Sequence, residues 1–210
     1  MSELYGPGAR ALQDHFDARR LADLLSTVTV HDELNDDDIA LIGAQSTVWL
    51  STVDADGWPD VSYKGGLPGF VRVVDPRTIE LPLYDGNGMF RSAGNITDTG
   101  RVALLFIDTD RPWRLRLHGT ATVVTDEARL ADHHGAKALI EVTVTRAFPN
   151  CGRYIHAGDD TDAAGLSDFV PRPGSEPPIP EWKTFDGISQ ALPADDPARV
   201  DPADPSPAAG

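Results

Sequence analysis

The most constraining feature of this sequence is a series of short β-branched and aromatic segments, separated by tight turns, between residues 46 and 170. Seven segments have strand length and composition: 47–53, 59–63, 70–74, 78–84, 101–108, 113–125 and 139–148. Several are joined by turns such as 54–57 and 75–77, which are too short to hold a helix. Parallel strands need long crossovers, so the pattern disfavours a βαβ series and predicts a mainly β fold, an antiparallel barrel or sandwich.

Helices are expected to flank these strands. Apolar residues spaced three and four apart over 9–25 predict one amphipathic helix. Acceptor side chains at 35–38 favour the start of a second helix over 39–44. Short helical stretches are expected at 89–96 and 127–133, so the class is β with flanking α.

Proline placement divides the chain. Ten of its 17 prolines fall in the last 40 residues, where they exclude long helices and central strands. We therefore expect an N-terminal helical segment (1–45), a β-barrel domain (46–170) and a proline-rich C-terminal arm and tail (171–210). Apolar side chains around Trp182 could dock the arm on the body or on a partner subunit, whereas the tail from Leu192 onward has too little apolar surface to order.

Charge excludes several classes of function. The chain has 33 acidic and 18 basic residues, a net charge of −15, which argues against nucleic-acid binding and a polybasic membrane anchor. No apolar run approaches the roughly 18 residues that span a bilayer, and no signal peptide is recognisable, so a cytoplasmic location is expected. With one cysteine, Cys151, no intrachain disulfide can form, and no histidine spacing indicates a metal site.

Two glycine-rich segments, 64–69 and 85–88, are the first candidates for chemistry. Backbone N–H groups of such a loop and helix start, with a nearby cation and hydroxyl, can hold a phosphate. The side chains available there are Lys64, Asn87, Arg91 and Ser92. The segments contain neither a P-loop nor a dinucleotide fingerprint, and the alternative is that the glycines only form tight turns.

A second candidate is the alternating segment 113–119. One face of this strand carries Trp113 and leucines, and the other carries Arg114, Arg116 and His118. The basic face is either a solvated sheet face or the lining of a site for an anionic ligand, because local basicity in an acidic protein attracts anions.

Taken together, several motifs resemble the pyridoxamine 5′-phosphate oxidase-related, flavin-binding split-barrel family. They are DADGWPDVSYKGGLPGFVRVVD (54–75), TIELPLYDGNGMFRSAGNI (78–96), RVALLFID (101–108), LRLHGTATV (115–123) and FPNCGRYIH (148–156). The resemblance covers roughly residues 9–185. It implies a split antiparallel β-barrel that forms a homodimer with FMN in two interface clefts.

The resemblance also assigns residues and a function. It places the flavin phosphate at Ser62, Lys64, Asn87 and Ser92, with Arg91 adjacent; Arg116 on the basic strand is a further candidate for cofactor binding. Many relatives carry arginine where this chain has Met89, and the Arg-x-His of true pyridoxamine phosphate oxidases has no counterpart near the C-terminus. We therefore expect a flavin-dependent oxidoreductase acting on a different, unidentified substrate. The alternatives are a non-catalytic module that binds flavin, heme or deazaflavin, and a cofactor-free structural dimer.

Overall fold

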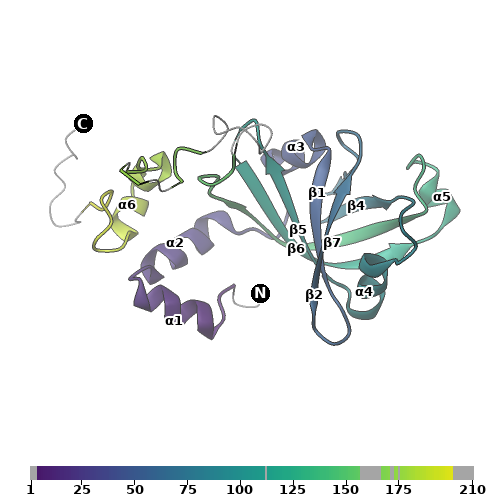
Figure 1. Ribbon diagram of the computed structural model, residues 1–210, viewed down its shortest axis with the longest axis horizontal. Helices are drawn as coiled ribbons and strands as arrows, with labels where there is room; N and C mark the ends of the chain where they lie inside the picture. Colours follow the sequence, from purple (N-terminus) through teal and green to yellow (C-terminus); the bar gives the residue numbers. More distant parts are fainter. Residues whose placement is uncertain (1–3, 112, 157–166, 171–172, 175, 201–210) are drawn as a thin grey trace. The chain divides into compact units, whose positions relative to one another are not determined.

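The computed structural model describes residues 4–111, 113–156, 167–170, 173–174 and 176–200. Contacts within the chain define two units, one of Met1–Val30 with Ser167–Gly210 and one of His31–Leu166. The second unit holds every strand of the described chain (Figure 1). The helical segment expected over 1–45 is thereby divided, because its last helix belongs with the strands.

All seven strands form one antiparallel sheet in the order β2-β1-β5-β6-β7-β4-β3. This confirms the expected mainly β class with flanking helices. The strands are β1 (Thr47–Val53), β2 (Pro59–Gly65), β3 (Arg72–Asp75), β4 (Thr78–Leu83), β5 (Arg101–Asp108), β6 (Trp113–Val124) and β7 (Ala138–Asn150).

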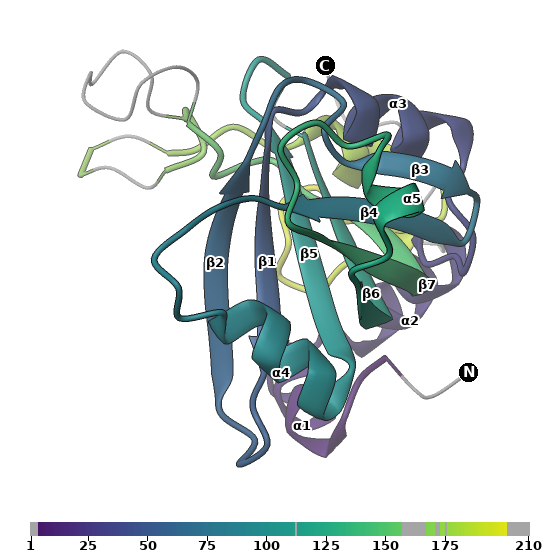
Figure 2. The same ribbon diagram turned by 90° about the vertical axis from the view of Figure 1, so that its right-hand side faces the viewer.

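The two longest strands join two wings of the sheet. The first part of β6 pairs with β5, whereas the first part of β7 pairs with β4. In Figure 2, β3 and β4 cross the direction of β1, β2 and β5, so the sheet is strongly curved. The β6–β7 register shifts between His118 and Gly119, where β6 passes from one wing to the other. Bulges of this kind bend a strand locally.

The core of this unit is formed largely by side chains from the strands of the sheet. Its fully buried members include Leu50, Phe106, Leu117 and Ile140, from β1, β5, β6 and β7. Burial of apolar surface of this kind is the dominant favourable term in folding. The strands thus form a rigid frame on which the polar side chains of β2 are carried.

Helix α3 (Asp36–Ala44) begins where the sequence indicates. The Asn35 side chain accepts a hydrogen bond from the Asp38 N–H at 2.9 Å, and the Asp38 carboxylate accepts one from the Asn35 N–H at 3.2 Å. This reciprocal pair is a capping box, which satisfies two donors at the helix start.

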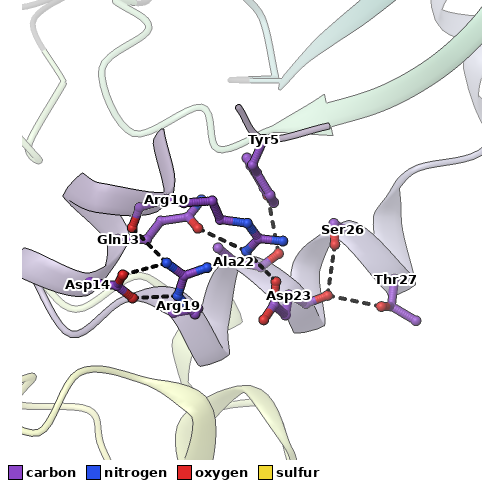
Figure 3. A network of polar contacts seen from close by, with 9 residues as sticks. All are labelled: Tyr5, Arg10, Gln13, Asp14, Arg19, Ala22, Asp23, Ser26 and Thr27. Atoms are coloured by element: carbon purple, nitrogen blue, oxygen red, sulfur yellow. Dashed lines mark hydrogen bonds and ion pairs between the residues drawn. The ribbon is translucent and has the colours of Figure 1, made fainter. Parts of the chain in front are cut away.

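The prediction of one helix over 9–25 is wrong. The structure has two helices, α1 (Pro7–His15) and α2 (Arg19–Thr29), with Asp17 between them at a φ of 50°. Polar contacts across this break hold the pair (Figure 3): Arg19 forms an ion pair with Asp14, and Arg10 forms one with Asp23 at 2.5 Å. Apolar periodicity continues across the break, and therefore did not reveal it.

The expectation that the tail from Leu192 onward has too little apolar surface to order is also wrong over residues 192–200. The arm forms a short 3₁₀ helix, η2 (Glu181–Thr184), and helix α6 (Ile188–Ala191), after which Leu192 is fully buried. The N–H of Ala194 donates to the Asp17 carboxylate at 2.9 Å, and Arg20 donates to the Leu192 carbonyl at 3.4 Å. These contacts stabilise residues 192–200 although the segment has few apolar side chains. The rest of the tail lies outside the described residues.

Candidate functional site

A cleft of about 540 Å³ opens in the sheet unit between strand β2 and the segment that links β4 to helix α4 (Arg91–Thr99). Figure 2 shows α4 against the ends of β1 and β2. The cleft brings together five of the six predicted site residues: Ser62, Lys64, Asn87, Arg91 and Ser92.

Strand β2 lines the cleft from Asp60 to Gly65, and burial alternates along it. Asp60, Ser62 and Lys64 are half-buried, whereas the residues between them are exposed. Burial lowers the pKa of the Lys64 ammonium group, and the nearby Asp60 carboxylate opposes this by raising it. A cation removed in part from water binds an anion more strongly than a fully solvated one.

Helix α4 contributes its N-terminal end. Two side-chain hydrogen bonds to β1 hold the helix: the Asn95 side-chain amide donates to Thr52 Oγ1 at 2.9 Å, and the Thr99 hydroxyl donates to the Val53 carbonyl at 2.8 Å. Phe90, just before the helix, has a φ of 48° and offers no side-chain cap. The N–H groups of residues 91–93, in the first turn of α4, donate to no acceptor among the described residues, so they are available to an anion.

Two serines connect the sides of the cleft. Ser92, in the first turn of α4, is buried, and its hydroxyl oxygen lies 3.0 Å from that of Ser62 on β2. A serine hydroxyl is both donor and acceptor, so the pair can reorient toward a ligand oxygen. No histidine or cysteine is part of the cleft lining that the structure describes, so the lining offers binding groups and no serine–histidine pair.

Asn87 shapes the loop. Its side-chain oxygen accepts a hydrogen bond from the Met89 N–H at 3.0 Å, and its amide lies 3.4 Å from the Met89 sulfur. Gly88 between them has a φ of 76°, a conformation that favours glycine. Asn87 thus forms an Asx turn that sets the path of the chain into α4.

The cations in the cleft have acidic neighbours. Arg91 lies 3.8 Å from the Asp60 carboxylate and 3.9 Å from that of Asp54, at the long limit of ion pairing. Lys137 forms an ion pair with Asp85, which lowers the pKa of that carboxyl group. Lys64 forms no ion pair within the described part of the chain, which leaves its charge available for a ligand.

Arg116 does not line the cleft. Its cross-strand neighbours are Leu105 and Phe148, and the same row continues through Trp49 to Tyr63 on β2. Residues in one such row share a face of the sheet, and Tyr63 points away from the face of Ser62 and Lys64. Arg116 therefore lies on the opposite face from the phosphate-binding candidates of its own chain, and its role in cofactor binding stays a prediction.

Sequence reasoning missed several residues of the lining. Asp60 could have been found, because it alternates with Ser62 and Lys64 along one strand. No pattern in the sequence around Lys137 indicates that it lines the cleft. It does so because β7 pairs with β4, and the backbone N–H of Lys137 donates to the Leu83 carbonyl at 2.8 Å.

Residues 36–151 match the family model described as Pyridoxamine 5′-phosphate oxidase. The matched region contains all seven strands and the whole cleft lining, so fold and site define a mainly β protein of the split-barrel class. The chain belongs to the pyridoxamine 5′-phosphate oxidase family.

Among solved structures, the chain is similar to HupZ from Group A Streptococcus, at 27% identity over 55% of this chain and 93% of that one, with a TM-score of 0.46. It is similar to an FAD binding protein from Mycobacterium smegmatis (22%; 59% and 97%; TM-score 0.41). A third similar structure is an FMN-binding protein from Syntrophomonas wolfei (13%; 68% and 94%; TM-score 0.40). No curated protein matches the sequence. None of the described helices is long and apolar enough to cross a membrane.

Proposed function

We propose that this protein is a homodimeric flavoprotein that binds FMN in the β2–α4 cleft and uses it in the oxidation or reduction of a small molecule. The observation that carries the proposal is the convergence of Lys64, Arg91, Ser62 and Ser92 on the first turn of α4. Cations, hydroxyl groups and unpaired backbone N–H groups in one place fit a phosphate monoester.

In this proposal each residue of the cleft has a separate role in binding. Lys64 and Arg91 neutralise the phosphate, the two serines donate to its oxygens, and Asn87 positions the loop. When bound, the flavin supplies two-electron redox chemistry, while the protein supplies anchoring and orientation. A substrate other than pyridoxamine 5′-phosphate stays our expectation.

A dimer is supported by the outer face of the sheet. Trp49, Val61 and Tyr63 are 42%, 64% and 58% exposed on neighbouring strands, and the Trp49 and Tyr63 rings meet edge to face at 5.5 Å. Exposed apolar clusters of this kind often mark interfaces. Size-exclusion chromatography with light scattering should give twice the 22.6 kDa chain mass, and a strict monomer would refute this part.

FMN and riboflavin titrations test the site, because the two ligands differ only in the phosphate. Lys64→Ala should weaken FMN binding about 10- to 100-fold, the effect of losing a hydrogen bond to a charged group, and change riboflavin binding little. Lys137→Ala is the matched control: this lysine lines the same cleft but is paired with Asp85, so we expect a change of less than about threefold.

Unchanged FMN affinity in Lys64→Ala would refute the phosphate assignment. Steady-state turnover with NAD(P)H would separate the oxidoreductase from a non-catalytic module, in which bound flavin is not turned over. A protein that takes up no FMN would contradict the proposal as a whole.

A further inference from the structure

Met89 and Phe90 are large apolar residues that line the β2–α4 cleft and are not part of the core. Their exposed fractions are 67% and 59%, and both belong to segment 85–90, which links β4 to α4. Figure 2 shows this segment running from β4 past β2 to the start of α4. Adjacent apolar side chains that stay exposed at a cleft offer surface that a ligand can bury.

The backbone of Phe90 is strained. Its φ of 48° lies in the left-handed region, where Asp17 is the other non-glycine residue of the described chain. A bulky side chain destabilises this conformation, whereas glycine adopts it at no steric cost. Strained residues of this kind concentrate at ligand clamps and switch regions. The chain thus keeps a phenyl ring at this position at a cost in stability, which indicates a role outside folding.

Segment 85–90 is lightly attached to the sheet. Among the described residues, its side-chain polar contacts are the ion pair of Asp85 with Lys137 and a local turn within the segment itself. Both partners of this ion pair are exposed, and exposed ion pairs contribute little to stability. Gly86 and Gly88 also permit large backbone rotations. The segment can therefore move without disrupting packed structure.

Phe90 also directly precedes the groups that we assign to the phosphate. It is followed by the first turn of α4, which carries Arg91 and the buried Ser92. The Arg91 side chain is 52% exposed, so water has access to this end of the cleft. An apolar group that covers an ion pair excludes water from it and thereby strengthens the electrostatic attraction.

We propose that segment 85–90 is a lid, and that Met89 and Phe90 close over the phosphate end of the bound flavin. The closed lid buries apolar surface, excludes water from the phosphate and its cations, and slows the release of the cofactor. This inference rests on the proposed function, because it requires that FMN binds in the β2–α4 cleft.

The rates at which FMN and riboflavin leave the full-length protein, measured by stopped-flow fluorescence at low and at high salt, test the lid. Phe90→Gly is the main variant: it removes the ring, and glycine suits the positive φ, so its Tm should be no lower than that of the wild type. Phe90→Leu restores an apolar side chain. Phe16→Gly is the matched control, because this phenylalanine is 64% exposed and lies outside the cleft lining.

We expect Phe90→Gly to release FMN about tenfold faster than the wild type. The difference should grow with salt, because salt screens exposed ion pairs more than covered ones. Phe90→Leu and Phe16→Gly should stay within about threefold of the wild type, and riboflavin release should change less than about twofold.

Unchanged FMN release in Phe90→Gly, or an equal acceleration for riboflavin, would overturn the lid and leave the proposed function intact. If the wild type takes up no FMN, both proposals are wrong.

Discussion

The curvature of the sheet depends on a single residue, Gly119. A β-carbon at this position would lie 2.5 Å from the Thr143 carbonyl oxygen and 2.8 Å from Val142 Cγ1, both on the neighbouring strand β7. Ordinary carbon–oxygen contacts between strands are roughly 3.3 Å, so Gly119→Ala must separate β6 from β7 by roughly 0.8 Å. The strands meet here at their register shift, where the backbone has little room to adjust.

The expected cost follows from this clash. Overpacking of a dense interior costs about 1–3 kcal/mol, and replacement of glycine by alanine returns about 0.4–1 kcal/mol by reducing the entropy of the unfolded chain. The net destabilisation of Gly119→Ala should therefore be about 1–2 kcal/mol. For a chain of this length, that lowers Tm by about 2–8 °C.

Urea unfolding followed by tryptophan fluorescence measures this change, because Trp49, Trp58 and Trp113 all belong to the sheet unit. Gly43→Ala is the matched control: Gly43 is in helix α3, and a β-carbon there meets no atom within 4 Å. That variant should be stabilised by up to about 1 kcal/mol. If Gly119→Ala is as stable as the wild type, the account of the bend at this residue is wrong.

Two further substitutions test the charges around the sheet. Glu80 is buried on β4 against Arg129 and His133. Burial alone would raise its carboxyl pKa, but hydrogen bonds from both partners outweigh burial and lower it. The ionised group therefore stabilises the fold above its usual pKa of 4.5, and this contribution is lost as the pH falls through its lower folded value. Glu80→Gln should cost about 2–4 kcal/mol at neutral pH and less in acid, and equal costs in urea unfolding at both would contradict this. Asp60→Asn, which frees Arg91 from a carboxylate 3.8 Å away, should tighten FMN binding about fivefold at low salt and less at high salt; weaker binding in fluorescence titration would count against it.

Local patterns predicted most of the fold. The expected bounds of two strands, 47–53 and 101–108, agree with β1 and β5, because β-branched runs ended by turn residues specify both ends of a strand. The start of α3 was likewise predictable from a few neighbouring residues, those that cap the helix. The helix break at Asp17 was not predictable in the same way, since it depends on a positive φ and on ion pairs that form only when α1 and α2 pack together.

The site was predictable where one strand or one loop carries it. Ser62 and Lys64 are two residues apart on β2, so they must share a face, and Ser92 follows the glycine-rich loop directly. The face on which Arg116 lies was not accessible in this way. It follows from the pairing of β5 with β6 and, above all, from the pairing of β1 with β5, which connects residues about 50 positions or more apart.

The arrangement of charge across the sheet shows how so acidic a chain can hold cations in its cleft. In the cleft, carboxylates accompany the cations: Asp60 and Asp54 lie near Arg91, and Asp85 pairs with Lys137. In the proposed phosphate site, a ligand would compete with these carboxylates for Arg91, whereas Lys64 forms no ion pair among the described residues. No such carboxylate accompanies Arg114 and Arg116 within the described chain, and burial, followed by the charge of Arg114, lowers the pKa of Arg116. Within the described chain, the sheet thus separates a cleft in which Arg91 and Lys137 have carboxylate neighbours and Lys64 has no ion pair from a face whose arginines form none.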